Sequence, residues 1–398
     1  MALADLPTTA SPMRRGVPKG FQSGASLDLD KGTASAVMPV EPEATEDERT
    51  WRTEIETQTG MTVPDDREVI LTGVRLWNMG PTQNRHLTFK IVPRSVACGT
   101  VDLEALLKLA RANSRRKPLK PTEKALTQTR IVGLSDEQLG KVDRHGGTEA
   151  FFERLGELLH DLDEEMRTNP AEDCVIALGG DMIEGFENTA QQGFTNDTSH
   201  PAMLTTAHAY LVQAITHIAS RHVHTRVLAV PSNHGAWRRG KDELGKPSDD
   251  YGLAVVSMVA SALHMDERWQ SVEFLFPDEW DVSCAVQVRD DVVALTHGHV
   301  GNTFTPEGFK KWFLGQVAGD SPIAQATILL SGHYHHRRVW PLGNLGDRER
   351  THIQMPALDG GSSWFTNKTG EWSHPGIWTA VIRDGYGLDH ERVLRPAR

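Results

Sequence analysis

Short apolar runs that end in metal-binding residue types constrain the fold of this 398-residue chain more than any other feature. The clearest run is Ala326–Leu330, which is followed by Gly332, His333 and His335. An apolar run of this length predicts a buried strand, and a glycine permits a sharp turn at its end. In an extended continuation the two histidines would project to the same side. Converging imidazoles suit a borderline divalent metal, although an exposed histidine-rich turn is an alternative.

Four earlier apolar runs end in the same way. They cover residues 130–134, 174–178, 227–230 and 292–296, and each is followed by Asp, Asn or His beside glycine or another small residue. The residues in question are Asp136 and Gln138, Asp181 and Glu184, Asn233 and His234, and His297 and His299. Oxygen donors mixed with imidazoles are what a pair of divalent cations prefers. Taken singly, these residues also fit turns or a buried, hydrogen-bonded histidine.

Strand and helix patterns alternate from about residue 128. Apolar residues at helical spacing predict amphipathic helices over 148–166 and 201–221, and a third helix over 250–264. Strand patterns dominate afterwards, at 272–276, 284–288, 292–296, 326–330, 353–357 and 377–382. This order predicts an α/β domain in which two packed sheets carry outer helices. Ligands of such sheets bind beyond the carboxyl ends of the strands, which is where the candidate residues stand.

The first third of the chain has a different composition. Pro, Gly, Ser, Thr, Ala and Glu dominate residues 1–65, whose only aromatic residues are Phe21 and Trp51. Such a segment buries too little apolar surface to offset its ordering entropy, so we predict a disordered tail with at most a short helix near 46–57. Residues 66–127 are predicted to form a small accessory region, with strands at 69–74 and 87–92, a turn at 78–81 and a helix at 101–111. The α/β domain then occupies 128–398.

The formal net charge of −11 argues against a broadly basic nucleic-acid-binding protein. Charge is uneven, however, because Lys108–Arg130 contains eight basic residues and only one acidic residue, Glu123. This basic segment can meet phosphates, or it can be a solvated connector.

The remaining composition favours a cytoplasmic protein. Cys98, Cys174 and Cys284 are too few and too far apart for a disulfide framework or a cysteine zinc site. No apolar run is long enough to span a bilayer, and the first residues lack the pattern of a secretion signal. No membrane partner is expected, and the sequence predicts no oligomeric state.

The order of the five motifs resembles the signature of the calcineurin-like metallophosphoesterase superfamily. The motifs are Asp136-Glu137-Gln138, Gly180-Asp181, Asn233-His234, His297-Gly298-His299 and Gly332-His333-Tyr334-His335. The resemblance covers about residues 128–340 and implies a four-layered α/β/β/α domain that holds two divalent metal ions.

The resemblance also implies a role for each matching residue. Asp136, Gln138, Asp181 and His335 would hold one metal ion. Asp181, as a bridging ligand, would hold the other together with Asn233, His297 and His333. His234 matches the histidine that protonates the leaving group or steadies the phosphate.

The chain departs from the usual pattern at three positions. Gln138 stands in place of a histidine, so an amide oxygen replaces an imidazole. This harder donor favours Mn²⁺, with Mg²⁺, Fe²⁺ and Zn²⁺ as alternatives. Ser232 replaces a glycine, which is expected to adjust only the backbone. Gly235 replaces the acidic residue that orients the catalytic histidine in many members, so His234 must be held by another group or have an ordinary pKa.

The function implied is dimetal-dependent hydrolysis of a phosphoester. Two cations would activate a water that attacks phosphorus in line, and His234 would protonate the leaving alkoxide. Trp237, Arg238 and Arg239 are expected to contact substrate together with His299, since guanidinium groups bind phosphate and an indole stacks on a base. The same trio also fits a surface loop whose long side chains lie along apolar surface. Glu184 is expected to support the metal site or to cap the following helix.

Phosphodiesters are the expected substrates, because the pattern is similar to nuclease-like members of the superfamily found in phage and bacterial genomes. The predicted function is therefore a nuclease, exo- or endo-acting, on DNA. A phosphatase or phosphodiesterase for small molecules or phosphoproteins is one alternative. A binding module with a decayed site is the other.

Overall fold

The chain forms two units, Met1–Ala97 and Cys98–Arg398. We describe them from a computed structural model, which describes residues 24–28, 33–39, 48–65, 67–79, 82–93, 116–120, 128–186, 196–239, 242–301, 303–363, 366–367, 370 and 372–397. No helix of these residues is long and apolar enough to cross a bilayer.

The smaller unit is an antiparallel sheet with one helix. Its elements are β1 (Gly24–Asp28), β2 (Thr33–Pro39), α1 (Glu48–Thr59), β3 (Arg67–Met79) and β4 (Thr82–Pro93), and the strand order is β1-β2-β4-β3. Small and β-branched side chains of the sheet pack under the helix. The buried residues are Ala34, Ala36, Ile55, Val63, Val69, Leu87, Phe89 and Ile91.

This sheet changes the picture of the first 65 residues. We predicted a disordered tail there, but β1, β2 and α1 lie within it and share a core with β3 and β4. The apolar content of β1 and β2 is low, and partner surface for them comes from residues after 65, so composition alone missed these two strands. The predicted strands at 69–74 and 87–92 fall inside β3 and β4, and the helix near 46–57 overlaps α1. The predicted helix at 101–111 lies outside the described residues.

The larger unit contains two sheets that face each other. The six-stranded sheet has the order β10-β7-β6-β5-β16-β17, and the five-stranded sheet has the order β11-β12-β13-β15-β14. The strands of the first are β5 (Gln128–Leu134), β6 (Asp173–Leu178), β7 (His224–Ala229), β10 (Val272–Leu275), β16 (Ile377–Arg383) and β17 (Gly387–Leu394). Those of the second are β11 (Ser283–Val288), β12 (Asp291–Thr296), β13 (Ile328–Ser331), β14 (Arg338–Leu345) and β15 (Arg348–Gln354). A short hairpin pairs β8 (Arg238–Arg239) with β9 (Asp242–Glu243).

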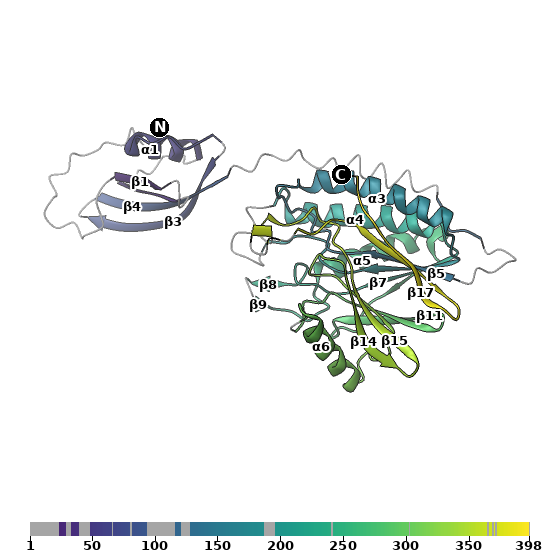
Figure 1. Cartoon of the computed structure of the whole chain (residues 1–398). Helices are drawn as coiled ribbons and strands as arrows, with labels where there is room; N and C mark the ends of the chain where they lie inside the picture. The colour runs from purple at the N-terminus through teal and green to yellow at the C-terminus, as the bar shows by residue number, and fades with distance from the viewer. Residues whose placement is uncertain are drawn as a thin grey trace. The chain divides into compact units, whose positions relative to one another are not determined.

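Helices cover both outer faces of this pair of sheets (Figure 1). α3 (Thr148–Thr168), α4 (His200–Ala219) and α5 (Tyr251–His264) pack on the six-stranded sheet, and a one-turn 3₁₀ helix, Glu267–Trp269, follows α5. α6 (Pro306–Ala318) packs on the five-stranded sheet, where Phe309 and Phe313 contact β12 and β13. A third core between the sheets joins alternate residues of both, for example Ile131, Val175 and Leu330. The predicted four-layered α/β/β/α arrangement is confirmed.

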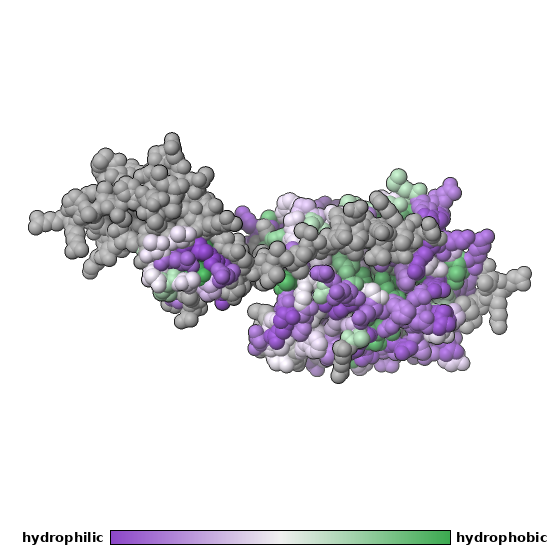
Figure 2. Space-filling view, turned by 90° about the horizontal axis from the view of Figure 1, so that it is seen from above, coloured by the Kyte–Doolittle hydropathy of each residue, from purple (hydrophilic) through white to green (hydrophobic). Residues whose placement is uncertain are grey.

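Strand direction brings the candidate residues to one edge. β5, β6, β7 and β10 are parallel to one another, and so are β12, β13 and β15. Parallel strands end at the same edge of a sheet, and the loops after β5, β6, β7, β12 and β13 carry the five motifs. Figure 2 shows one face of the larger unit, on which hydrophilic residues predominate. The buried apolar side chains of this unit belong to the three cores.

Candidate metal centre

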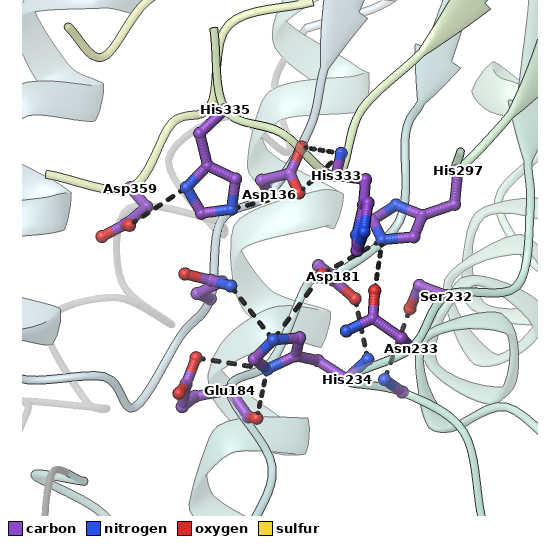
Figure 3. A network of polar contacts seen from close by, with 12 residues as sticks. Asp136, Asp181, Glu184, Ser232, Asn233, His234, His297, His333, His335 and Asp359 are labelled. Atoms are coloured by element: carbon purple, nitrogen blue, oxygen red, sulfur yellow. Dashed lines mark hydrogen bonds and ion pairs between the residues drawn. The ribbon is translucent and has the colours of Figure 1, made fainter. Parts of the chain in front are cut away.

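The five motif loops converge on one cluster of polar side chains (Figure 3). Asp181 lies near the middle, with Asn233, His297 and His333 on one side of it. Asp136 and His335 lie on the other side, together with a residue that the sequence analysis did not select, Asp359. Asp136, Asp181 and His297 are at most 1% exposed. Buried charges at this density must be paired or bind a cation.

Left-handed backbone conformations concentrate in these loops. Five residues of the motifs other than glycine have positive φ, namely Asp136 (54°), Gln138 (45°), Asp181 (52°), His333 (73°) and His335 (60°). Such conformations cost energy outside glycine and occur where the surrounding structure enforces them, commonly at functional sites. The extended continuation that we predicted for His333 and His335 is therefore wrong. Their side chains diverge, His333 toward His297 and His335 toward Asp136.

Asp181, His297 and His333 form the tightest group. Their potential ligand atoms all lie within 4.8 Å of one another. His297 Nδ1 donates to the carbonyl oxygen of Gly179 at 2.7 Å, which leaves Nε2 as the ring's ligand atom. Asp181 Oδ2 lies 3.1 Å and Asn233 Oδ1 2.9 Å from that nitrogen. The lone pairs of these three atoms therefore point toward a common position. Either a proton on His297 Nε2 or a cation shared by the three residues can occupy that position, and the mixed N and O donors fit a divalent metal.

The pKa values of this group follow from burial and mutual charge. Burial alone would raise the pKa of Asp181, but His297 and His234 lower it well below the ordinary value. Burial opposes the charged form of His297, yet the Asp181 carboxylate raises its pKa to about 9. Burial, and then the nearby His297, lowers the pKa of His333 to about 3, so this imidazole is neutral and able to bind a metal at neutral pH.

The side of the centre around Asp136 contains a lysine. Lys141 Nζ donates to Gln138 Oε1 at 2.9 Å and forms a short ion pair with Asp359. His335 Nε2 lies 3.4 Å from Asp136 Oδ1, and His335 Nδ1 lies 3.6 Å from Asp359 Oδ2. The amide oxygen that we predicted as a metal ligand is therefore already hydrogen-bonded to an ammonium group.

Burial dominates the electrostatics of this side. It raises the pKa of Asp136 to about 7, and the positive charge of His297 offsets only part of the effect. The main-chain N–H of His333 and the hydroxyl of Ser135 donate to the Asp136 carboxylate. Burial also lowers the pKa of His335 well below its ordinary value, and Lys141 adds to this. For Lys141 itself burial acts against the charge, but Asp359 raises the pKa, so the amine stays protonated.

Glu184 is the group that holds His234. His234 Nδ1 donates to the main-chain oxygen of Glu184 at 2.7 Å and lies 3.3 Å from its carboxylate. The main-chain N–H of His234 donates to Asp181 Oδ1 at 2.9 Å. Burial disfavours the imidazolium, but Asp181 and then Glu184 raise the pKa of His234 to about 10. The pKa of His234 is therefore far from ordinary, although Gly235 supplies no carboxylate.

Asp250 explains why glycine occupies position 235. A Cβ at Gly235 would meet the Asp250 carboxylate at 2.4 Å, so an acidic side chain does not fit there. Asp250 Oδ2 accepts from the main-chain N–H of Ser232, and Oδ1 accepts from Leu253 N at the start of α5. One carboxylate thus caps a helix and fixes the loop that carries Asn233 and His234.

The predicted substrate residues lie in different places. Trp237 and Arg238 line a cavity next to His234, and the guanidinium of Arg238 is paired with Glu243 at 2.5 Å. His299 is half-buried, with its ring 5.2 Å from that of His297, and its Nδ1 has no hydrogen-bond partner among the described residues. Arg239 is exposed in β8, opposite Asp242 of β9, and does not line this cavity.

Sequence reasoning missed three residues of the centre: Lys141, Asp250 and Asp359. Asp359 follows β15 and precedes Gly360, which is the same signal that selected the other loops. Asp250 precedes an apolar helix pattern and reads as a helix cap. Nothing local distinguishes Lys141, because its role depends on a partner more than 200 positions away.

Comparisons with known proteins give structural matches only. No protein-family model matches the chain, and no curated protein is found to be similar to it in sequence. Vps29 from Cryptosporidium parvum is similar in structure, with 14% identity, 67% of this chain and 96% of that chain covered, and a TM-score of 0.31. Zinc-bound Vps29 from Entamoeba histolytica matches with 11% identity, 66% and 98% coverage and a TM-score of 0.28. A metallophosphoesterase from Sphaerobacter thermophilus matches with 12% identity, 68% and 88% coverage and a TM-score of 0.28.

Matches this distant assign no activity. The class of fold follows from the chain itself, in which two facing sheets with outer helices bring five Asp, Asn and His loops to one edge. This is the four-layered α/β/β/α arrangement, with the motif loops at one edge, that the resemblance of the motifs implied.

Proposed function

We propose that this protein is a metal-dependent hydrolase of phosphodiesters, and that DNA is its substrate. The observation that carries the proposal is the convergence of Asp181, Asn233, His297 and His333 at the strand ends, beside a histidine held by Glu184. Neither a structural core nor a surface turn explains a buried cluster of mixed oxygen and nitrogen donors.

Each side of the centre would hold one cation. Asp181, Asn233, His297 and His333 supply the donors on one side, and Asp136 and His335 supply those on the other, with Asp181 between them. Divalent cations, when bound there, supply Lewis acidity to a phosphoryl group and activate water for attack. Gln138 is retained as a candidate ligand through its second lone pair, since Lys141 uses only one.

His234 is the proton donor in this proposal. Its Nδ1–H is used by Glu184, so Nε2 is the atom that faces the centre, 3.9 Å from Asp181 Oδ2. A pKa of about 10 keeps Nε2 protonated at neutral pH when no cation is bound. That proton can pass to the oxygen of a leaving alcohol, which otherwise departs as a poor leaving group.

Exposed aromatic surface near His234 favours a nucleic-acid substrate. Trp237 is 54% exposed in the wall of a cavity that His234 also lines, and base stacking is a use for such a ring. The basic segment gives less support, because the described part of it, residues 116–120, places the Arg116 guanidinium on His217 of α4 at 2.7 Å.

The test is a substrate panel with Mn²⁺. Circular, linear and single-stranded DNA are incubated with the purified chain, beside bis(4-nitrophenyl) phosphate and 4-nitrophenyl phosphate. We expect cleavage of DNA and of the diester, and loss of both in Asp181→Asn. Hydrolysis of the monoester alone would replace the proposal by a phosphatase. No hydrolysis together with no bound manganese would replace it by a binding module.

A further inference from the structure

A cavity of about 350 Å³ opens beside the proposed proton donor. Aromatic and imidazole rings dominate its wall, which is formed by Phe186, His200, His234, Trp237 and Tyr251 with Gly185, Ala236 and Arg238. These residues come from the loop after β6, the start of α4, the loop after β7 and the start of α5. A concave, largely aromatic site with few polar groups is the usual form of a small-ligand pocket.

The rings of this cavity form a continuous series. Trp237 and Tyr251 lie nearly parallel, with their centroids 6.0 Å apart and 26° between their planes. His200 meets Tyr251 edge-on at 4.6 Å, and Phe186 lies 6.1 Å from His200. Despite this packing, 54% of Trp237 and 37% of Phe186 are exposed. Aromatic surface that is aligned yet left open to solvent is available for stacking on a planar group.

The cavity and the metal centre share one residue, His234. The imidazole of His234 lines the cavity, while its main-chain N–H donates to Asp181 and its Nε2 lies 3.9 Å from the Asp181 carboxylate. A group bound in the cavity would lie beside the proposed proton donor, which is the position of the part of the substrate that receives the proton. In a phosphodiester that part is the leaving alcohol.

The charge and the size of the cavity further restrict the class of ligand that it can bind. Among the described residues of the wall, only Arg238 carries a side chain of fixed charge, and its guanidinium pairs with Glu243 at 2.5 Å. Burial lowers the pKa of His200, so this ring is a neutral partner for hydrogen bonds at the edge of a ligand. The volume lies near the lower end of the about 300–1,000 Å³ range of ligand pockets, which is enough room for a single base.

We propose that this cavity binds the unpaired nucleobase of the leaving nucleotide, with the base stacked on Trp237. The inference rests on the proposed phosphodiesterase function and deepens it. It assigns the substrate to single strands, frayed ends or short oligonucleotides, because a base inside a duplex cannot enter without leaving its stack. Phe186, His200 and Tyr251 become specificity-determining residues, and none of them belongs to the five motifs.

The experiment uses three dinucleotides with the full chain and Mn²⁺. Dithymidine monophosphate carries a base on both sides of the phosphate, and the other two carry an abasic sugar on the 3′ or on the 5′ side. We expect wild-type protein to hydrolyse dithymidine monophosphate and one abasic form at similar kcat/KM, and the other abasic form about tenfold or more slowly. Trp237→Ala should lower kcat/KM for the two faster substrates to the value of the slow abasic form and leave kcat/KM for the slow form unchanged. Trp237→Phe should retain most of kcat/KM for the faster substrates.

Trp280→Ala is the matched control, since this tryptophan is 65% exposed and does not line the cavity. Equal rates on all three dinucleotides, or a Trp237→Ala effect that is the same on all three, would overturn the inference. Hydrolysis of bis(4-nitrophenyl) phosphate without hydrolysis of any dinucleotide would also overturn it while preserving the phosphodiesterase. Absence of hydrolysis of every diester would instead reject the proposed function.

Discussion

The two sides of the candidate centre use similar residue types but differ in electrostatics. On one side, neighbouring histidines lower the pKa of Asp181 well below its ordinary value, so this carboxylate is ionised. On the other, burial raises the pKa of Asp136 to about 7, and the ammonium group of Lys141 lies against Gln138. A positive charge fixed near one side lowers the attraction of that side for a cation. The comparison teaches that all five motif loops can be present while the two sides of the centre that they form differ in charge.

Replacing the central carboxylate should have the largest effect on this comparison. Asp181→Asn removes the charge that both sides share, so we expect Mn²⁺ affinity to fall by more than the about 10–100-fold that loss of an outer partner costs. Phosphodiester hydrolysis should be abolished. Titration calorimetry and metal analysis measure the binding, and circular dichroism checks the fold. Asp136→Asn is the paired variant and should remove only the weaker of two binding events. Equal losses of Mn²⁺ affinity in Asp181→Asn and Asp136→Asn would show that the two sides of the centre are equivalent.

Replacing the proposed proton donor, His234, should have the next largest effect. His234→Gln is expected to lower kcat for phosphodiesters by about 100- to 10,000-fold, because proton transfer to the leaving oxygen is lost. Manganese binding should stay within a few-fold of wild type, since the His234 ring is not among the predicted ligands. Glu184→Gln is the positioning control. It should lower kcat less than His234→Gln does and move the alkaline limb of the pH profile to lower pH, because Glu184 helps to keep the proton donor protonated. Full activity in His234→Gln would exclude the assigned role.

The opposite pKa shifts of Asp136 and Asp181 predict opposite effects on stability. Asp136 has a folded pKa raised to about 7, so its ionised form costs stability above its ordinary pKa of 3.8, and the cost grows until about pH 7. In chelator-treated protein, Asp136→Asn should therefore raise the unfolding free energy at pH 8 by roughly 2–4 kcal/mol and by less at pH 5. Asp181 has a lowered pKa, so Asp181→Asn should reduce stability at both pH values.

Denaturant unfolding at pH 5 and pH 8 measures these differences. Active sites commonly keep groups that destabilise the fold, so the sign of the stability change matters more here than its size. Destabilisation by Asp136→Asn at pH 8 would show that the two carboxylates are held alike.

Local sequence predicted most of the larger unit because strand and helix periods are local signals. Strands such as 174–178 and helices such as 148–166 matched to within a few residues. α6 was missed, although Thr305 caps it and Pro306 begins it, because only Phe309 and Phe313 of its residues are buried and the helical pattern is weak. β1 and β2 were missed because a strand poor in large side chains depends on the partners it finds in the fold.

The residues of the candidate metal centre also fall into a group that local sequence predicted and a group that it did not. The five loops were predictable, since glycine and a ligand-type residue after an apolar run is a signal in one stretch of chain. The hold of Glu184 on His234, the ion pair of Lys141 with Asp359 and the clash of any side chain at 235 with Asp250 were not predictable. Each of these contacts joins two segments that are distant in the sequence, and local sequence patterns do not predict that they meet in space.

Metal preference should show the smallest change and tests the role of Lys141 directly. Lys141→Met removes the ammonium group and leaves Asp359 and the Gln138 oxygen available, so we expect the weaker Mn²⁺ affinity to rise about tenfold, which is about 1.4 kcal/mol. Gln138→His should instead raise Zn²⁺ or Fe²⁺ affinity relative to Mn²⁺, because imidazole is the softer donor. Lys246→Met is the control, since this lysine pairs with Glu279 at the surface. If neither Lys141→Met nor Gln138→His changes the metal affinity of the weaker site, the second cation does not bind between Asp136, Gln138 and His335. The protein would then function with the Asp181 side alone.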